Sequence, residues 1–204
     1  MAAAIQEAEA LREAEFGNSG LAKQVAAAAP SGELASILAS LALARAGESS
    51  RSQSLADKLD RHFPSDTMLQ RYWLPTIRGA ISLHKNPSAA LGALQSVVYE
   101  LGSSEGFQGM RALYPVYIRG QAYLGTRQGK EAAAEFQKFL DHRSIVLNSP
   151  VGALARLGLA RAYALQGDTT KARGAYQDFL ALWKDADPDI PVLQQAKAEY
   201  AKLQ

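Results

Sequence analysis

Apolar and small residues recur every three or four positions along almost the whole chain, and short stretches rich in glycine, asparagine or aspartate interrupt them. This spacing is the period of an amphipathic helix, and a short turn between two such helices predicts a helical hairpin. One hairpin cannot bury its apolar faces alone. We therefore expect an all-α protein in which neighbouring hairpins stack on one another.

The pattern repeats itself along the sequence. Residues 119–140, RGQAYLGTRQGKEAAAEFQKFL, and residues 160–180, ARAYALQGDTTKARGAYQDFL, align without a gap at an offset of 40, which pairs Tyr123 with Tyr163 and Phe139 with Phe179. Similar copies precede them, and they place Ala22, Ser52 and Ala90 where the later copies have alanine. Self-similarity of this kind predicts an array of structural repeats.

Small residues at fixed positions allow two helices to approach closely, and aromatic residues fill the space around them. The small positions of the last two copies are Gly120, Ala122, Ala132, Ala162 and Ala172. The aromatic positions are Tyr123, Phe136, Phe139, Tyr163, Tyr176 and Phe179. The repeated spacing therefore indicates, first of all, how the helices pack.

The order of Ala-Tyr, a Gly-Asp turn, alanine and two aromatic positions in residues 153–184 resembles the tetratricopeptide repeat. The resemblance implies an α-solenoid, a right-handed superhelix formed by one domain over residues 1–204. Its repeats would cover about residues 3–32, 33–70, 71–112, 113–152 and 153–187. The third copy departs from the pattern, with Arg78 at the glycine position and Lys85-Asn86-Pro87 in place of Gly-Asp.

The segment 189–204 is expected to form a capping helix over the last repeat. Asp189 and Pro191 suit a helix start, and Leu193, Ala196 and Tyr200 form one apolar stripe. The aspartates at 185, 187 and 189 resemble the opening of a calcium loop, but Ile190 stands where such a loop needs glycine.

Residues 114–120, 132–148 and 158–204 are similar to the C-terminal repeat region of bacterial eukaryotic-like serine/threonine kinases and related multidomain regulators. The similarity implies the regulatory or scaffold part of a larger signalling protein. The default location is the cytoplasm, or the extracytoplasmic side if the parent kinase is membrane-anchored. The kinase signatures themselves do not occur in the chain, so any kinase activity would reside in another domain.

Composition argues against several other functions. The chain has no cysteine, which excludes thiol catalysis and cysteine-ligated metals, and its net charge of +2 is spread along the sequence without a nucleic-acid footprint. His62, His84 and His142 lack the spacing of a helical metal site. We expect no enzyme activity, no cofactor or metal, and no insertion into a membrane.

The expected function is binding of a protein or peptide partner. The first helix of each tetratricopeptide pair lines a concave groove, and the corresponding positions here are Tyr72, Pro75, Tyr114, Tyr117, Gln121, Leu154, Leu157 and Arg161. Tyrosine offers contact area with few rotamers, and arginine offers a donor fork for a carboxylate. The alternative is that several of these side chains, Tyr114 and Leu154 especially, pack against the neighbouring repeat.

A second function is compatible with the same sequence. The first repeat is the weakest copy, and its segment KQVAAAA, residues 23–29, lacks large side chains. The array could then act in self-association through this end, as a homo-oligomerisation module.

Overall fold

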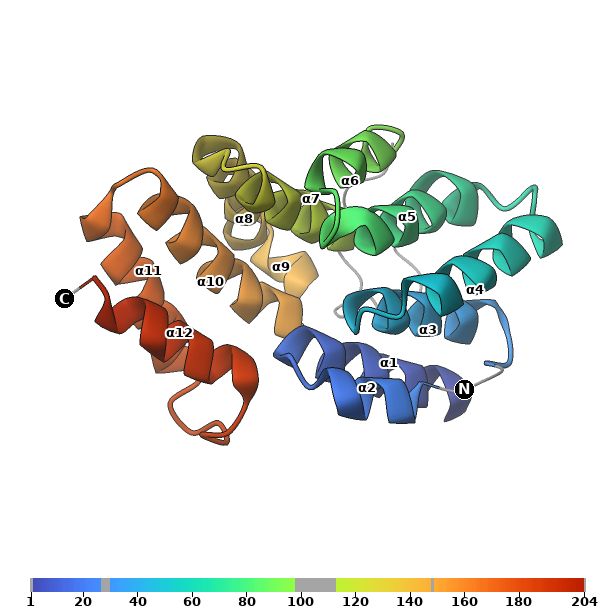
Figure 1. The fold of residues 1–204 in the computed structure, drawn as a ribbon, viewed down its shortest axis with the longest axis horizontal. Helices are drawn as coiled ribbons and strands as arrows, with labels where there is room; N and C mark the ends of the chain where they lie inside the picture. The colour runs from blue at the N-terminus through green and yellow to red at the C-terminus, as the bar shows by residue number, and fades with distance from the viewer. Residues whose placement is uncertain (1, 27–29, 98–112, 148, 204) are drawn as a thin grey trace. The chain divides into compact units, whose positions relative to one another are not determined.

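The computed structural model describes residues 2–26, 30–97, 113–147 and 149–203, and all regular structure in these ranges is helical (Figure 1). The expected all-α class is therefore confirmed. The chain groups into two compact units, Met1–Tyr99 and Glu100–Gln204, and the expected single repeat domain stays a prediction. Each unit is described by itself.

The first unit consists of paired helices, coloured blue to green in Figure 1. Its elements are α1 (Ala2–Phe16), α2 (Ser19–Val25), α3 (Glu33–Arg45), α4 (Ser49–His62), the π-helix η1 (Leu69–Trp73), α5 (Leu74–Leu83) and α6 (Pro87–Leu94). Helix α3 lies in the middle, where it packs against α1, α4 and α5. Its residues from Ile37 to Ala44 are all buried, so α3 runs through the core of this unit.

The second unit is arranged around α10. Its elements are α7 (Tyr114–Gly125), α8 (Gly129–Asp141), α9 (Arg143–Val146), α10 (Pro150–Leu165), α11 (Thr169–Leu182) and α12 (Pro191–Ala201). Helix α10 packs against α7, α8 and α11, and α12 packs against α11 (Figure 1). The segment expected to form a capping helix is α12, and its apolar residues Leu193 and Ala196 are buried.

Four hairpin turns share one hydrogen-bond pattern. In each, a backbone N–H donates to the carbonyl five residues earlier: Asn18 to Glu13, Glu48 to Leu43, Gln128 to Tyr123 and Asp168 to Tyr163, at 2.8–3.0 Å. The residue before each of these donors is left-handed: Gly17, Gly47, Arg127 and Gly167. This is the Schellman motif, which ends one helix and allows the next to begin at once.

The turn of the remaining hairpin, between α5 and α6, has a different hydrogen-bond pattern. The N–H groups of both Lys85 and Asn86 donate to the carbonyl of Ser82, and no residue of the turn is left-handed. Asn86 caps α6 by accepting the N–H of Ala89 at 3.0 Å, and Pro87 occupies the first turn of the helix. An asparagine cap followed by proline starts a helix without the glycine of the other turns.

The second helix of every hairpin carries a buried small residue four positions after the N-cap. These residues are Ala22, Ser52, Ala90, Ala132 and Ala172. The residues one helical turn later are buried as well: Ala26, Ala56, Leu94, Phe136 and Tyr176. The small positions that the sequence repeat aligns are thus buried in all five hairpins.

The left-handed residue in the α7–α8 turn predicts a stabilising substitution. Arg127 has φ 60°, a conformation that costs a side-chain-bearing residue about 1–2 kcal/mol, whereas glycine adopts it freely. We expect Arg127→Gly to raise the free energy of unfolding of the second unit by about 0.5–1 kcal/mol, since glycine is also more flexible in the unfolded chain. Gly167→Ala, at the equivalent turn, should lower it by about 1 kcal/mol.

The two tryptophans allow the free energy of unfolding to be measured for each unit separately. Trp73 lies in the first unit and Trp183 in the second. Urea unfolding followed by the fluorescence of Trp183 in a Trp73→Phe background reports on the second unit. A stability that is unchanged or lower in Arg127→Gly would contradict the argument from the left-handed turn.

Candidate interaction surface

Six of the eight predicted groove residues lie in the core. The exposed fractions of Tyr72, Tyr114, Tyr117 and Leu157 are 0%, 1%, 3% and 1%, and Pro75 and Leu154 are buried too. In this conformation none of these side chains is accessible to a partner. These side chains contribute to the core of their own unit instead.

Aromatic contacts within the second unit explain the burial of Tyr117. Its ring lies edge-on to Phe136 and Phe139 of α8, with centroids 6.2 and 6.3 Å apart, and close to Tyr114. In the first unit Tyr72 packs edge-on against Trp73 at 4.6 Å. The large apolar area that makes tyrosine a good contact residue makes it equally suitable for the core.

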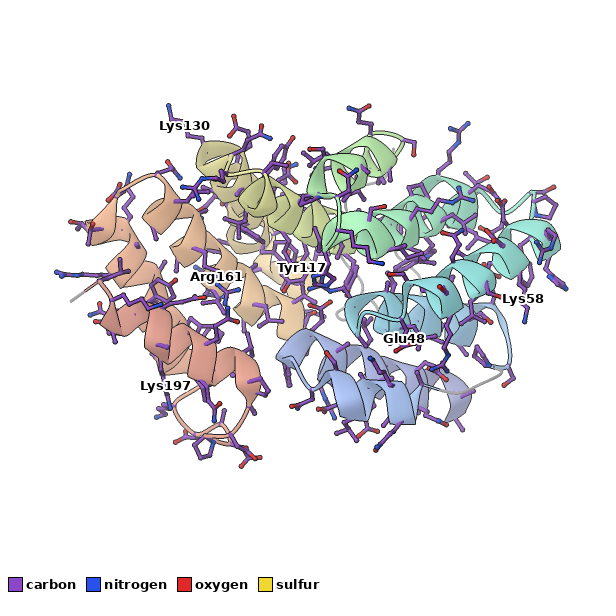
Figure 2. The ribbon with its side chains drawn as sticks, in the orientation of Figure 1. Glu48, Lys58, Tyr117, Lys130, Arg161 and Lys197 are labelled. Atoms are coloured by element: carbon purple, nitrogen blue, oxygen red, sulfur yellow. The ribbon has the colours of Figure 1, made fainter. Side chains whose placement is uncertain are left out.

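Gln121 and Arg161 are the two predicted residues that remain partly exposed. They occupy the same position, 40 residues apart, in α7 and α10, which are neighbours in the second unit. Arg161 lies on the side of α10 that faces α12 (Figure 2). These two residues are therefore the accessible ones among the predicted groove positions.

Arg161 pairs with a carboxylate from the C-terminal helix. Its Nε donates to Glu199 Oε2 at 2.9 Å, and the two side chains are 27% and 25% exposed. The Tyr176 hydroxyl donates to the same oxygen at 3.0 Å. Burial raises the pKa of Tyr176, and the negative charge of Glu199 raises it further, so the hydroxyl keeps its proton and remains a donor.

The guanidinium of Arg161 is only partly satisfied by Glu199. Its Nη2 is buried and has no hydrogen-bond partner among the residues that the structure describes. An arginine can hold a carboxylate through two parallel N–H···O bonds, which is the strongest arrangement for this pair. Glu199 instead uses a single oxygen for both Arg161 and Tyr176.

Further polar contacts hold the end of α12 against α11. Gln177 donates from Nε2 to the Tyr200 hydroxyl at 2.9 Å, and Arg173 Nε donates to the carbonyl of Leu203 at 2.6 Å. The rings of Tyr176 and Tyr200 are 6.1 Å apart. The sequence did not indicate any of these contacts, because each joins residues more than twenty positions apart with ordinary surface chemistry.

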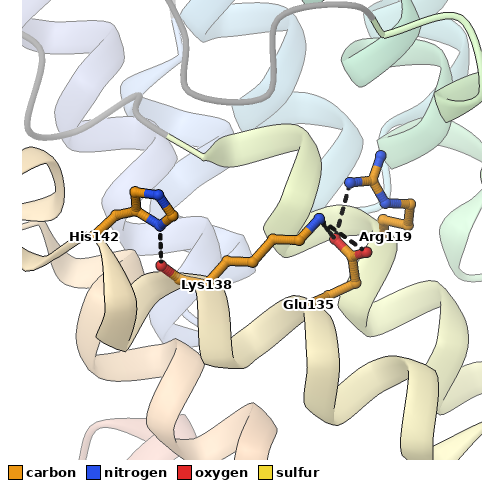
Figure 3. Close-up of polar contacts among 4 residues, drawn as sticks. All are labelled: Arg119, Glu135, Lys138 and His142. Atoms are coloured by element: carbon orange, nitrogen blue, oxygen red, sulfur yellow. Dashed lines mark hydrogen bonds and ion pairs between the residues drawn. The ribbon is translucent and has the colours of Figure 1, made fainter.

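A separate polar network lies between α7 and α8 (Figure 3). Arg119, two residues before Gln121, donates to Glu135 Oε2 at 2.9 Å, and Lys138 lies 3.4 Å from the same carboxylate. The backbone carbonyl of Lys138 also contacts Nδ1 of His142 at 2.9 Å. This network joins α7 to α8 and keeps the hairpin closed.

The histidines have local structural contacts. His62 Nδ1 and His142 Nδ1 each contact a carbonyl of the preceding turn. Burial lowers the pKa of His84, and the nearby charge of Arg45 lowers it further. Across the ranges listed above, no group of three or more histidine, aspartate or glutamate residues is arranged to hold a metal ion.

The first unit has an open depression along α4. It is lined by Ser49, Ser50, Gln53, Ser54, Asp57, Arg61 and Ile81. Gln53 donates to Asp57 at 2.7 Å within it, so part of its polar lining is already paired. None of the predicted groove residues lines this depression.

Within the part of the chain that the structure describes, no helix has the length and apolar character needed to span a bilayer. No protein-family model, curated protein or solved structure matches the chain.

Proposed function

We propose that the chain is a non-catalytic protein-interaction module built from tetratricopeptide-like repeats, each unit being a stretch of right-handed α-solenoid. The observation that carries the proposal is the equivalence of the five hairpins. Each has its buried small residue four positions after the N-cap of the second helix, and four share the same left-handed turn. Arrays of equivalent hairpins present their first helices side by side and form extended binding surfaces.

The proposed binding surface in the second unit is a row of equivalent, partly exposed side chains. Gln121 of α7 and Arg161 of α10 occupy one position of the repeat, and Glu199 of α12 lies next to Arg161. We term these three residues the groove row. A partner segment lying across the first helices would meet this row, and the module would act as the regulatory or scaffold part of a larger signalling protein.

Site-specific photo-crosslinking tests this surface. A photoreactive residue at Gln121 is expected to capture one partner from lysate of the source cells, and unlabelled chain should compete with the capture. The control places the same residue at Ala134, which is exposed on α8. Capture of the same products from both positions, or of none from position 121, would count against the groove row.

Two exposed apolar side chains favour a second candidate, self-association through the first hairpin. Ile5 of α1 and Leu21 of α2 are 56% and 47% exposed. Ala27, Ala28 and Ala29 of the segment discussed above lie outside the described residues. Under this alternative the mass in sedimentation rises with concentration, and Ile5→Lys/Leu21→Lys abolishes the rise. A chain that stays monomeric at all concentrations excludes it.

A further inference from the structure

We propose that the C-terminal half of α12 is a displaceable latch, in which Glu199 occupies the site where Arg161 and the Tyr176 hydroxyl receive a carboxylate side chain of an acidic partner segment. This inference rests on the proposed function, because it names the partner chemistry of the same groove row. It also gives the row two states, one closed by the chain itself and one bound to a partner.

The geometry at Arg161 favours exchange of one carboxylate for another. Glu199 accepts from Arg161 Nε at 2.9 Å and from Tyr176 at 3.0 Å through the single atom Oε2. The buried Nη2 of Arg161 has no partner among the described residues. A carboxylate that reached both Nε and Nη2 would satisfy this buried donor as well, and it would therefore bind better than Glu199 does.

The two halves of α12 are held by different forces. In the first half Val192, Leu193 and Ala196 are buried, and this apolar contact fixes the start of the helix. In the second half none of residues 197–203 is buried, and the segment is held by the contacts of Glu199, by hydrogen bonds from Gln177 to Tyr200 and from Arg173 to the carbonyl of Leu203, and by the neighbouring rings of Tyr176 and Tyr200. A helix segment without a buried side chain opens at a lower free-energy cost than one fixed in the core, so this half opens more easily than the first.

Opening the latch changes the charge of the groove row. In the closed state the negative charge of Glu199 offsets the positive charge of Arg161. When Glu199 leaves, the row presents the guanidinium of Arg161 and the neutral amide of Gln121, with the hydroxyl of Tyr176 beside Arg161. A guanidinium beside a phenol donor binds a carboxylate and repels a basic segment, so we infer an acidic partner.

The test uses the full chain and a short fluorescent peptide of alternating glutamate and alanine, with a glutamine–alanine peptide as the neutral probe. Glu199→Gln removes the competing carboxylate, and we expect it to bind the acidic peptide about three- to tenfold more tightly than the wild-type chain does. The control is Glu131→Gln, which changes the net charge by the same amount. Glu131 is exposed on α8, so this variant should bind the acidic peptide like the wild-type chain. Arg161→Gln/Glu199→Gln should lose the binding.

A second readout distinguishes displacement from binding elsewhere. In the wild-type chain, the acidic peptide should increase hydrogen exchange of the backbone amides at 199–203, while α11 stays protected. Equal affinity of wild type and Glu199→Gln, or unchanged binding in Arg161→Gln/Glu199→Gln, overturns the latch. If the acidic peptide binds no variant while position 121 still crosslinks a partner, the latch fails and the interaction module stands.

Discussion

Replacing Gly158 by alanine is expected to lower the free energy of unfolding of the second unit by about 1–3 kcal/mol, the range for overpacking a closed core. A Cβ added at Gly158 would lie 2.5 Å from Cζ of Phe136, and two other ring atoms lie within 2.7 Å. The ring has no room to move toward α7, because it packs against Gly120 there. A Cβ built at Gly120 would lie 2.8 Å from Cζ of Phe136. Phe136 itself is fully buried.

The clash can be separated from a general effect of glycine replacement. Gly174→Ala on α11 meets no atom within 4 Å, so it should be neutral or stabilise by up to about 1 kcal/mol through helix propensity. Phe136→Leu replaces the ring by a smaller side chain. The double variant Gly158→Ala/Phe136→Leu should therefore lose less free energy of unfolding than the sum of the two single variants. Trp183 fluorescence during urea unfolding measures all four variants. Additive losses would show that ring and glycine do not interact.

The second large effect is expected in the first unit, at the ion pair between α1 and α3. Arg45 donates from Nε to Glu15 Oε1 at 2.6 Å and from Nη2 to Oε2 at 3.0 Å, and the side chains are only 8% and 2% exposed. Glu15→Leu removes both hydrogen bonds and leaves the charge of Arg45 in a buried site. We expect a loss of about 3–5 kcal/mol in the free energy of unfolding.

Replacing both partners provides the decisive comparison. Glu15→Leu/Arg45→Met buries two apolar side chains of similar volume and should recover most or all of the wild-type stability. Glu48→Gln breaks the exposed pair with Lys23 in the same unit and should change little. Trp73 fluorescence in a Trp183→Phe background measures these variants. A double variant as unstable as Glu15→Leu would contradict the account of this pair.

The sequence was a good guide to the hairpins and their packing. Ala132 and Ala172 were expected in the core from the 40-residue offset, and both are buried, each four residues after the N-cap of its helix. The same offset aligns Arg127 with Gly167, so the unusual left-handed arginine could have been found from the sequence. The alignment with Gly167 predicts the geometry of the turn, because that geometry depends only on local residues.

The sequence was a poor guide to which first-helix residues are accessible. Tyr117 and Gln121 are one helical turn apart and share a face, yet Tyr117 is buried and Gln121 is not. Periodicity gives the face of a helix, whereas the depth of burial depends on side chains of the neighbouring helix, here Phe136 and Phe139. The pairing of Arg161 with Glu199 likewise depends on how α12 packs, which no local pattern encodes.

The central claim is that the first-helix face of the second unit recognises a partner. Hydrogen-exchange mass spectrometry on the full chain, with and without the partner captured at position 121, tests it most directly. The account predicts new protection of α7 and α10 around Gln121 and Arg161, together with faster exchange at 199–203. Protection confined to α8 and α11, with α12 unchanged, would contradict it.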